Sequence, residues 1–200
     1  MKLTRAQIEA VLRAGDGIAV EYIHGGIVAA GIQFFEEGRA SHFLCSAGRL
    51  DTIEEDIGGC MATRLDTYLK GKCSLTVVRI DPPLSPEEVG EVLRFWNDEV
   101  SNSYGFGSVL RGGFAEVIRH WVLPVAPPLA RFMLRVFARI VGHQPPDCSA
   151  LWVMGHRKMR PGIFRGWDSE EVTPAEAIRP RPNVKHVVRW DRPILVTEDI

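Results

Sequence analysis

Residues 39–56, RASHFLCSAGRLDTIEED, hold two β-type runs, 39–46 and 50–56, on either side of Ala47-Gly48-Arg49. A short glycine-containing segment between two such runs is typical of an antiparallel hairpin. Further β-type runs lie at 17–23, 27–35, 73–80 and 184–190. The sequence therefore predicts an antiparallel sheet of about five to six strands.

Helical segments surround these runs. Thr4 and Gln7 form a capping box that predicts a short leading helix, ended by Gly15. Ser85, followed by Pro86 and Glu88, begins the clearest helix of the chain, which carries an apolar stripe. Other predicted helices lie at 63–69, 114–123 and 129–141, with two more that begin at Cys148 and Thr173. Together with the strands, they predict an α+β fold in which the sheet packs against helices.

The composition fits one globular domain over residues 1–200, with 46% hydrophobic and 24% charged residues. The 24 Lys and Arg nearly balance the 25 Asp and Glu, so nucleic acid is not expected as a partner. Four cysteines without a C-x-x-C pair predict no metal site, and no cofactor is expected. The N-terminus lacks the apolar core of a signal peptide, which favours the cytoplasm and leaves non-classical export open.

Cys148 is the candidate nucleophile. It follows Pro145-Pro146-Asp147 and precedes an apolar run, so Asp147 can serve as N-cap and place the thiol in a first helical turn. Backbone N–H groups and the helix dipole at that position favour the thiolate, which is the reactive form. The alternative interpretation is a small buried cysteine without a chemical role.

A thiolate catalyst needs a base, usually a histidine that a third polar group orients. His42 lies within a predicted strand, and His143 lies in the loop before Cys148. A three-residue loop at Ala47-Gly48-Arg49 would place Glu54 directly opposite His42, whereas a two-residue turn would place Glu55 there. A packed or solvated strand histidine is the alternative for His42, and an exposed carboxylate is the alternative for Glu54.

The order of several short segments resembles the permuted branch of the NlpC-type peptidase superfamily, which includes YiiX-like proteins and relatives of lecithin:retinol acyltransferase. The resemblance implies a circularly permuted papain-like fold in which the histidine strand precedes the cysteine helix. The segments that carry it are Gly15-Asp16-Gly17-Ile18, Ala40-Ser41-His42, Leu50-Asp51-Thr52-Ile53-Glu54, Leu65-Asp66-Thr67-Tyr68-Leu69, Thr76-Val77-Val78-Arg79-Ile80, Ser103-Tyr104-Gly105 and Asp147-Cys148-Ser149.

The resemblance also implies roles for individual residues. Cys148 matches the nucleophile, His42 the base and Glu54 the orienting residue. Tyr104 matches a tyrosine near the cleft, where its hydroxyl could support substrate or an oxyanion; an aromatic packed under a loop is the alternative. Two features depart from the family: Leu44-Cys45-Ser46 is less hydrophobic than the usual strand, and a long helical insertion occupies about 108–141.

Arg131, Arg135 and Arg139 recur every four residues on a largely apolar predicted helix. Such a helix could rest on a membrane surface or a lipid substrate, which predicts peripheral membrane contact. The alternative is a helix packed on the core with one solvated arginine edge.

Three functions follow from these observations. The leading hypothesis is hydrolysis of an amide bond, in a peptide or a peptidoglycan fragment, through a thioester on Cys148. The second is a lipid thioesterase or acyltransferase that uses the same cysteine and histidine. The third is a non-catalytic binding module of the same fold.

Overall fold

The computed structural model describes residues 2–22, 40, 42–56, 59–69, 73–100, 125, 126, 129, 148–164, 172, 174–179, 181–191 and 195–197. The predicted strand at 27–35 lies outside these residues. So do Tyr104, the three arginines at 131, 135 and 139, and almost all of the predicted helical insertion at 108–141. The predictions made for those segments remain predictions.

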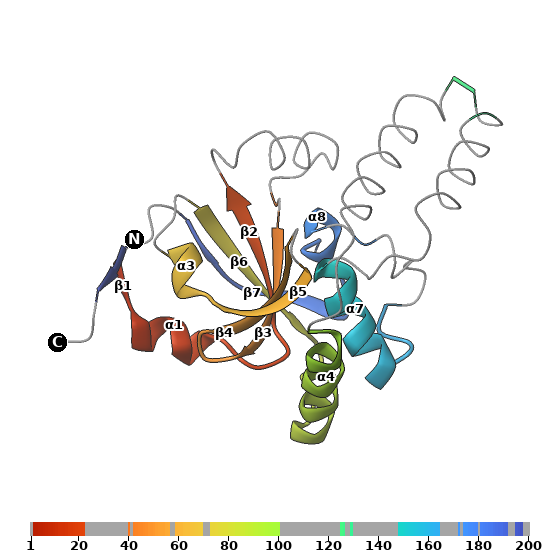
Figure 1. Ribbon diagram of the computed structural model, residues 1–200, viewed down its shortest axis with the longest axis horizontal. Coiled ribbons are helices and arrows are strands. Elements are labelled where there is room, and N and C mark those ends of the chain that lie inside the picture. The colour runs from red at the N-terminus through yellow and green to blue at the C-terminus, as the bar shows by residue number, and fades with distance from the viewer. Residues whose placement is uncertain are drawn as a thin grey trace.

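Within the described residues, six antiparallel strands form the main sheet, in the order β5-β4-β3-β2-β6-β7. This sheet, packed with helices, confirms the predicted α+β class. A second, two-stranded sheet pairs β1 with β8 in parallel near the chain ends (Figure 1). The strands are β1 (Lys2–Thr4), β2 (Gly17–Tyr22), β3 (His42–Gly48), β4 (Asp51–Asp56), β5 (Gly59–Arg64), β6 (Cys73–Ile80), β7 (Val184–Trp190) and β8 (Leu195–Thr197).

The region around residue 63 differs from the prediction. A helix was expected over 63–69, but Thr63 and Arg64 belong to β5, where they pair with Thr52 and Asp51 of β4. The helix α3 (Asp66–Leu69) takes only the end of that segment. Cross-strand pairing outweighs the local helix propensity of Thr63 and Arg64, because β5 extends the β3–β4 hairpin by one more strand.

The helices α1 and α4 begin where the capping signals in the sequence predict. α1 (Arg5–Val11) and α4 (Pro86–Glu99) both start with a complete capping box. α1 ends at Val11, with Leu12 as C-cap, and so stops before the predicted limit at Gly15. α7 (Cys148–Met159) and α8 (Pro174–Ala177) follow.

Two apolar clusters pack on the two faces of the sheet. In Figure 1, α4 and α7 lie on one side of it, while α1 and α3 lie on the other. The α7 side includes Phe43, Val78, Trp96 and Trp152. The α3 side includes Ile18, Leu44, Tyr68, Leu75 and Trp190. Each fully buried side chain of this size contributes roughly 1.5–3 kcal/mol to folding.

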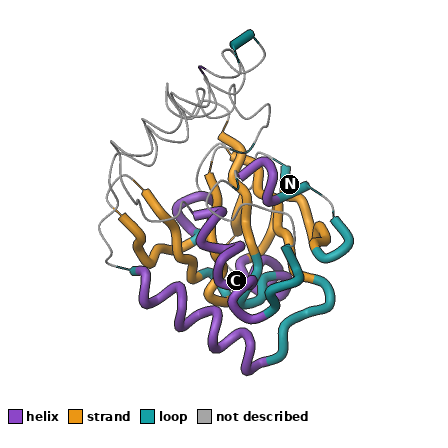
Figure 2. The backbone as a smooth tube through the Cα atoms, turned by 90° about the vertical axis from the view of Figure 1, so that its right-hand side faces the viewer, coloured by secondary structure: helices purple, strands orange, loops and turns teal. Residues whose placement is uncertain are grey.

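α7 packs against both β3 and α4, and Figure 2 shows these helices in front of the strands. The indole N–H of Trp96 on α4 donates to the carbonyl oxygen of Leu151, 3.1 Å away. Gly155 makes this approach possible, because a Cβ there would lie 2.5 Å from Nε1 of Trp96. None of the helices that the structure describes is long and apolar enough to span a membrane.

Candidate active site

The β3–β4 hairpin sets the register of the site. Leu44, and not His42, lies directly opposite Glu54. Neither register considered from the sequence is the observed one: Gly48 pairs with Asp51, and the register shifts at a bulge between Ser46 and Gly48. Left-handed backbone at Gly48 (φ 108°) and Arg49 (φ 54°) forms the tight turn. Neither Glu54 nor Glu55 therefore lies directly opposite His42, and Glu54 is offset from it by two residues.

An offset of two keeps both side chains on one face of the sheet, where diagonal neighbours are within reach of long side chains. Nε2 of His42 lies 2.8 Å from Oε2 of Glu54. The side chains are 18% and 9% exposed, so the pair is largely shielded from water yet not sealed. The structure thus brings together the histidine and one of the two carboxylates that the hairpin prediction considered.

Tyr68 completes the cluster, although no pattern in the sequence marks it as a site residue. Its hydroxyl donates a hydrogen bond to Oε2 of Glu54, the same oxygen that contacts His42. Its ring stacks on the imidazole with centroids 5.8 Å apart and planes at 27°. The thiol of Cys73 donates to the carbonyl oxygen of Tyr68 and ties α3 to β6. Tyr68 lay within a segment that carried the family resemblance, but no spacing rule connects a tyrosine on α3 to a β4 carboxylate.

The carboxyl group of Glu54 is held in its ionised form. Burial, the largest single influence, would raise its pKa, whereas the hydrogen bonds from His42 and Tyr68 lower it. The charge of His42 and a hydrogen bond from Thr63 lower it further, so the net pKa lies below the ordinary value. At neutral pH the carboxylate can therefore accept the N–H of Nε2, which leaves Nδ1 as the nitrogen that can exchange a proton with a thiol.

Two contacts made by Trp152 orient α7. Trp152 packs its ring on Phe43 of β3 and donates its indole N–H to the carbonyl oxygen of Gly15, at 3.0 Å. Gly15 in turn pairs with Ser46, near the far end of β3. His156, one turn further along α7, also lies beside Gly15. α7 therefore runs with its C-terminal half toward the Ser46 end of β3, so its N-terminus points toward the His42 end.

Cys148 is the first residue of α7. The next residue, Ser149, is fully buried and donates its hydroxyl to the carbonyl oxygen of Val172, at 2.6 Å, which anchors this turn. The side chain of Cys148 lies outside the described part of the structure, as does Asp147, its predicted N-cap.

His42 and α7 meet β3 on different faces. Phe43 points to the α7 side, where it contacts Trp152, whereas His42 points to the side that carries Tyr68. Neighbouring side chains of a strand alternate in this way. A thiol on the first turn of α7 can therefore reach the imidazole only past the end of β3, where His42 is the first residue of the strand.

The strand around His42 is well buried despite its composition. Leu44, Cys45 and Ser46 are all fully buried. The polar residues of this strand therefore do not prevent it from taking a central place in the sheet.

Comparison with known proteins places the fold. No family model matches the chain, and no curated protein matches it in sequence. Among solved structures, it is similar to the metalloprotein YiiX from Escherichia coli O157:H7, with a TM-score of 0.50 and 15% identity over 90% of this chain and 98% of YiiX. The class that fold and sheet define is an α+β domain of YiiX-like fold.

A metal site does not emerge from the described side chains. No group of three or more His, Cys, Asp or Glu among them could hold an ion together. His42 and Glu54 supply only two donors, and these are already bonded to each other.

Proposed function

We propose that this chain is a cysteine hydrolase that cleaves an amide bond through a thioester on Cys148. In this proposal His42 is the general base and acid, Glu54 orients its ring, and Tyr68 holds Glu54. The observation that carries the proposal is the 2.8 Å contact between Nε2 of His42 and Oε2 of Glu54, at the end of the sheet toward which α7 points Cys148.

Two properties of the pair suit this chemistry. The carboxylate accepts Nε2–H, which fixes the tautomer in which Nδ1 carries the lone pair. The lowered pKa of Glu54 means that the carboxylate also stabilises the imidazolium that forms when the thiol gives up its proton. A thiol at a helix N-terminus gains further from the backbone N–H groups there.

The reaction proceeds in two steps. The thiolate of Cys148 attacks the carbonyl carbon, a C–S bond forms, the C–N bond breaks, and the imidazolium of His42 gives its proton to the leaving amine. A water molecule then attacks the thioester while the imidazole takes one of its protons. The carboxylic acid leaves, and the thiolate and imidazolium are restored.

The observed fold is consistent with the superfamily that the proposal assumes. A YiiX-like fold is compatible with the permuted branch of the papain-like NlpC superfamily. The chain order agrees as well, because the histidine strand β3 precedes the cysteine helix α7. Permutation and family membership are part of the proposal, and so is the substrate class, a peptide or peptidoglycan fragment.

Trapping the acyl-enzyme tests the proposal. The protein is mixed with N-acetylated tripeptide 4-nitroanilides or with a fatty-acyl 4-nitrophenyl ester, quenched in acid, and analysed by peptide-resolved mass spectrometry. We expect the acyl mass on Cys148 from the anilides, lost in Cys148→Ala and retained in Cys60→Ala, a buried cysteine on β5. If only the lipid ester labels Cys148, the amidase proposal is contradicted and the lipid thioesterase or acyltransferase is favoured. No label from either would contradict both enzymes and favour the binding module.

A further inference from the structure

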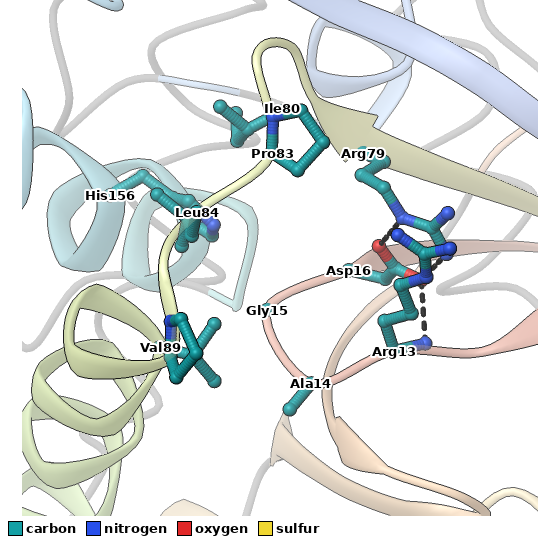
Figure 3. Close-up of a pocket in the computed structure, with 11 residues that line it drawn as sticks. Arg13, Ala14, Gly15, Asp16, Arg79, Ile80, Pro83, Leu84, Val89 and His156 are labelled. Atoms are coloured by element: carbon teal, nitrogen blue, oxygen red, sulfur yellow. Dashed lines mark hydrogen bonds and ion pairs between the residues drawn. The ribbon is translucent and has the colours of Figure 1, made fainter.

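A pocket of about 350 Å³ lies at the end of α7 remote from Cys148. Its volume falls within the range of small-molecule sites, roughly 300–1,000 Å³. Figure 3 shows His156 and Leu84 on one side of it and the cluster of Arg13, Asp16 and Arg79 on the other. Ile80 and Val89 add to its apolar wall.

His156 presents a buried acceptor to this pocket. The side chain is 1% exposed, and its Nδ1–H donates to the carbonyl oxygen of Trp152, 2.7 Å away. Burial lowers the pKa of His156 to about 4, although the backbone oxygens of Trp152 and Gly15 favour the protonated ring. The imidazole is therefore neutral at pH 7, and Nε2 carries a lone pair.

Nε2 of His156 has no hydrogen-bond partner among the described residues. Leaving a buried polar atom unpaired is costly, so such an atom in a native structure calls for a donor. The ring itself is held firmly, since Trp152 packs on it at 4.8 Å and Trp96 at 5.8 Å between centroids. Because His156 lines the pocket, a donor bound there can reach this nitrogen.

The opposite wall is positively charged. Arg79 binds the buried carboxylate of Asp16 through two hydrogen bonds of 2.6 Å, so these two charges compensate each other. Arg13 contributes its backbone N–H to Asp16, whereas its exposed guanidinium forms no hydrogen bond with the part of the chain that the structure describes. The Arg13 guanidinium therefore gives this side of the pocket a net positive charge.

We propose that this pocket binds a small organic anion with an apolar body and one O–H or N–H donor. The donor bonds to Nε2 of His156, the body packs on Leu84, Ile80 and Val89, and the anionic group faces Arg13. The site is separate from the His42 cluster, and its existence does not depend on hydrolysis at Cys148.

The probe is 4-hydroxybenzoate. Two control compounds are compared with it: benzoate, which lacks the O–H donor, and methyl 4-hydroxybenzoate, which lacks the negative charge. Binding is followed by the ¹⁵N resonance of His156 Nε2. We expect saturable binding of the probe, with the Nε2 resonance shifting toward that of a protonated nitrogen. Each control compound should bind about fivefold or more weakly. No saturable shift with any of the three would mean that the pocket holds water only and would overturn the proposal.

Two variants confirm the location. Arg13→Gln should lower the affinity for 4-hydroxybenzoate about fivefold. Because Arg13 is exposed, the stability of the protein without ligand should not change. Val89→Trp should block the pocket, whereas Asn97→Trp, at an exposed position of the same helix outside the pocket, should not. Binding that survives Arg13→Gln and Val89→Trp unchanged would place the probe elsewhere and overturn the assignment.

Discussion

Nε2 of His42 lies 2.8 Å from Oε2 of Glu54, although Leu44 is the residue that pairs with Glu54 across the hairpin. The two side chains meet diagonally on one face of the sheet. The bulge before Gly48 produces this offset, so the turn of the hairpin determines which carboxylate the histidine contacts.

Glu54→Gln should lower kcat/KM on the amide substrate by about a hundredfold, because an amide cannot stabilise the imidazolium of His42. Glu55→Gln is the matched control on the neighbouring residue, and it should leave the rate within about threefold of wild type. The ratio of the two rates is measured under identical conditions. A larger loss in Glu55→Gln would transfer the orienting role to that residue.

Tyr68→Phe removes the hydroxyl that donates to Glu54 and should lower the free energy of unfolding by about 1–2 kcal/mol. Urea unfolding of the two single variants and of Tyr68→Phe/Glu54→Gln forms a double-mutant cycle. The cycle should show coupling between the two positions. Additive losses would mean that Tyr68 stabilises the fold through packing alone.

Glu54 should make stability depend on pH. Its pKa is lower in the folded protein than in the unfolded chain, where the ordinary value is 4.5. Its ionised form therefore stabilises the fold above that value, and this contribution is lost as the pH falls through the folded pKa. We expect the stability advantage of wild type over Glu54→Gln to shrink as the pH falls below about 4.5, the ordinary value of this carboxyl. An advantage that grows in acid would contradict the lowered pKa.

Two helical glycines should respond in opposite directions. Gly90 of α4 has open space around its missing Cβ, so Gly90→Ala should raise the free energy of unfolding by about 0.5–1 kcal/mol. Gly155→Ala should lower it by about 1–3 kcal/mol, because the new methyl group would meet Trp96. Thermal and urea unfolding measure both. A stabilised Gly155→Ala would show that α4 and α7 do not pack as closely as described.

Much of the fold could be predicted from local patterns. The capping boxes at Thr4 and Ser85 mark real helix starts, and the β-branched run at Cys73–Ile80 forms a strand with the predicted bounds. These signals act over a few residues, so the sequence displays them directly. β5 escaped prediction because Gly59–Arg64 is held as a strand mainly by its pairing with β4.

The site could be predicted only in part. Residue type and order suggested His42 and Glu54, but the bulge that sets their register depends on left-handed backbone at Gly48 and Arg49. Tyr68 reaches Glu54 only because α3 folds back over the sheet, which is a tertiary contact without a local signal. The pocket beside His156 joins segments far apart in the chain and is equally invisible in the sequence.

The pairing of Cys148 with His42 can be measured through the rate of Cys148 alkylation by iodoacetamide as a function of pH. The peptide that contains Cys148 is followed by mass spectrometry, since Cys45, Cys60 and Cys73 are buried. An ion pair with His42 predicts an apparent thiol pKa below about 7 in wild type, rising toward about 8.5 in His42→Ala. The same pH profile in both proteins would contradict the pairing of this thiol with this imidazole.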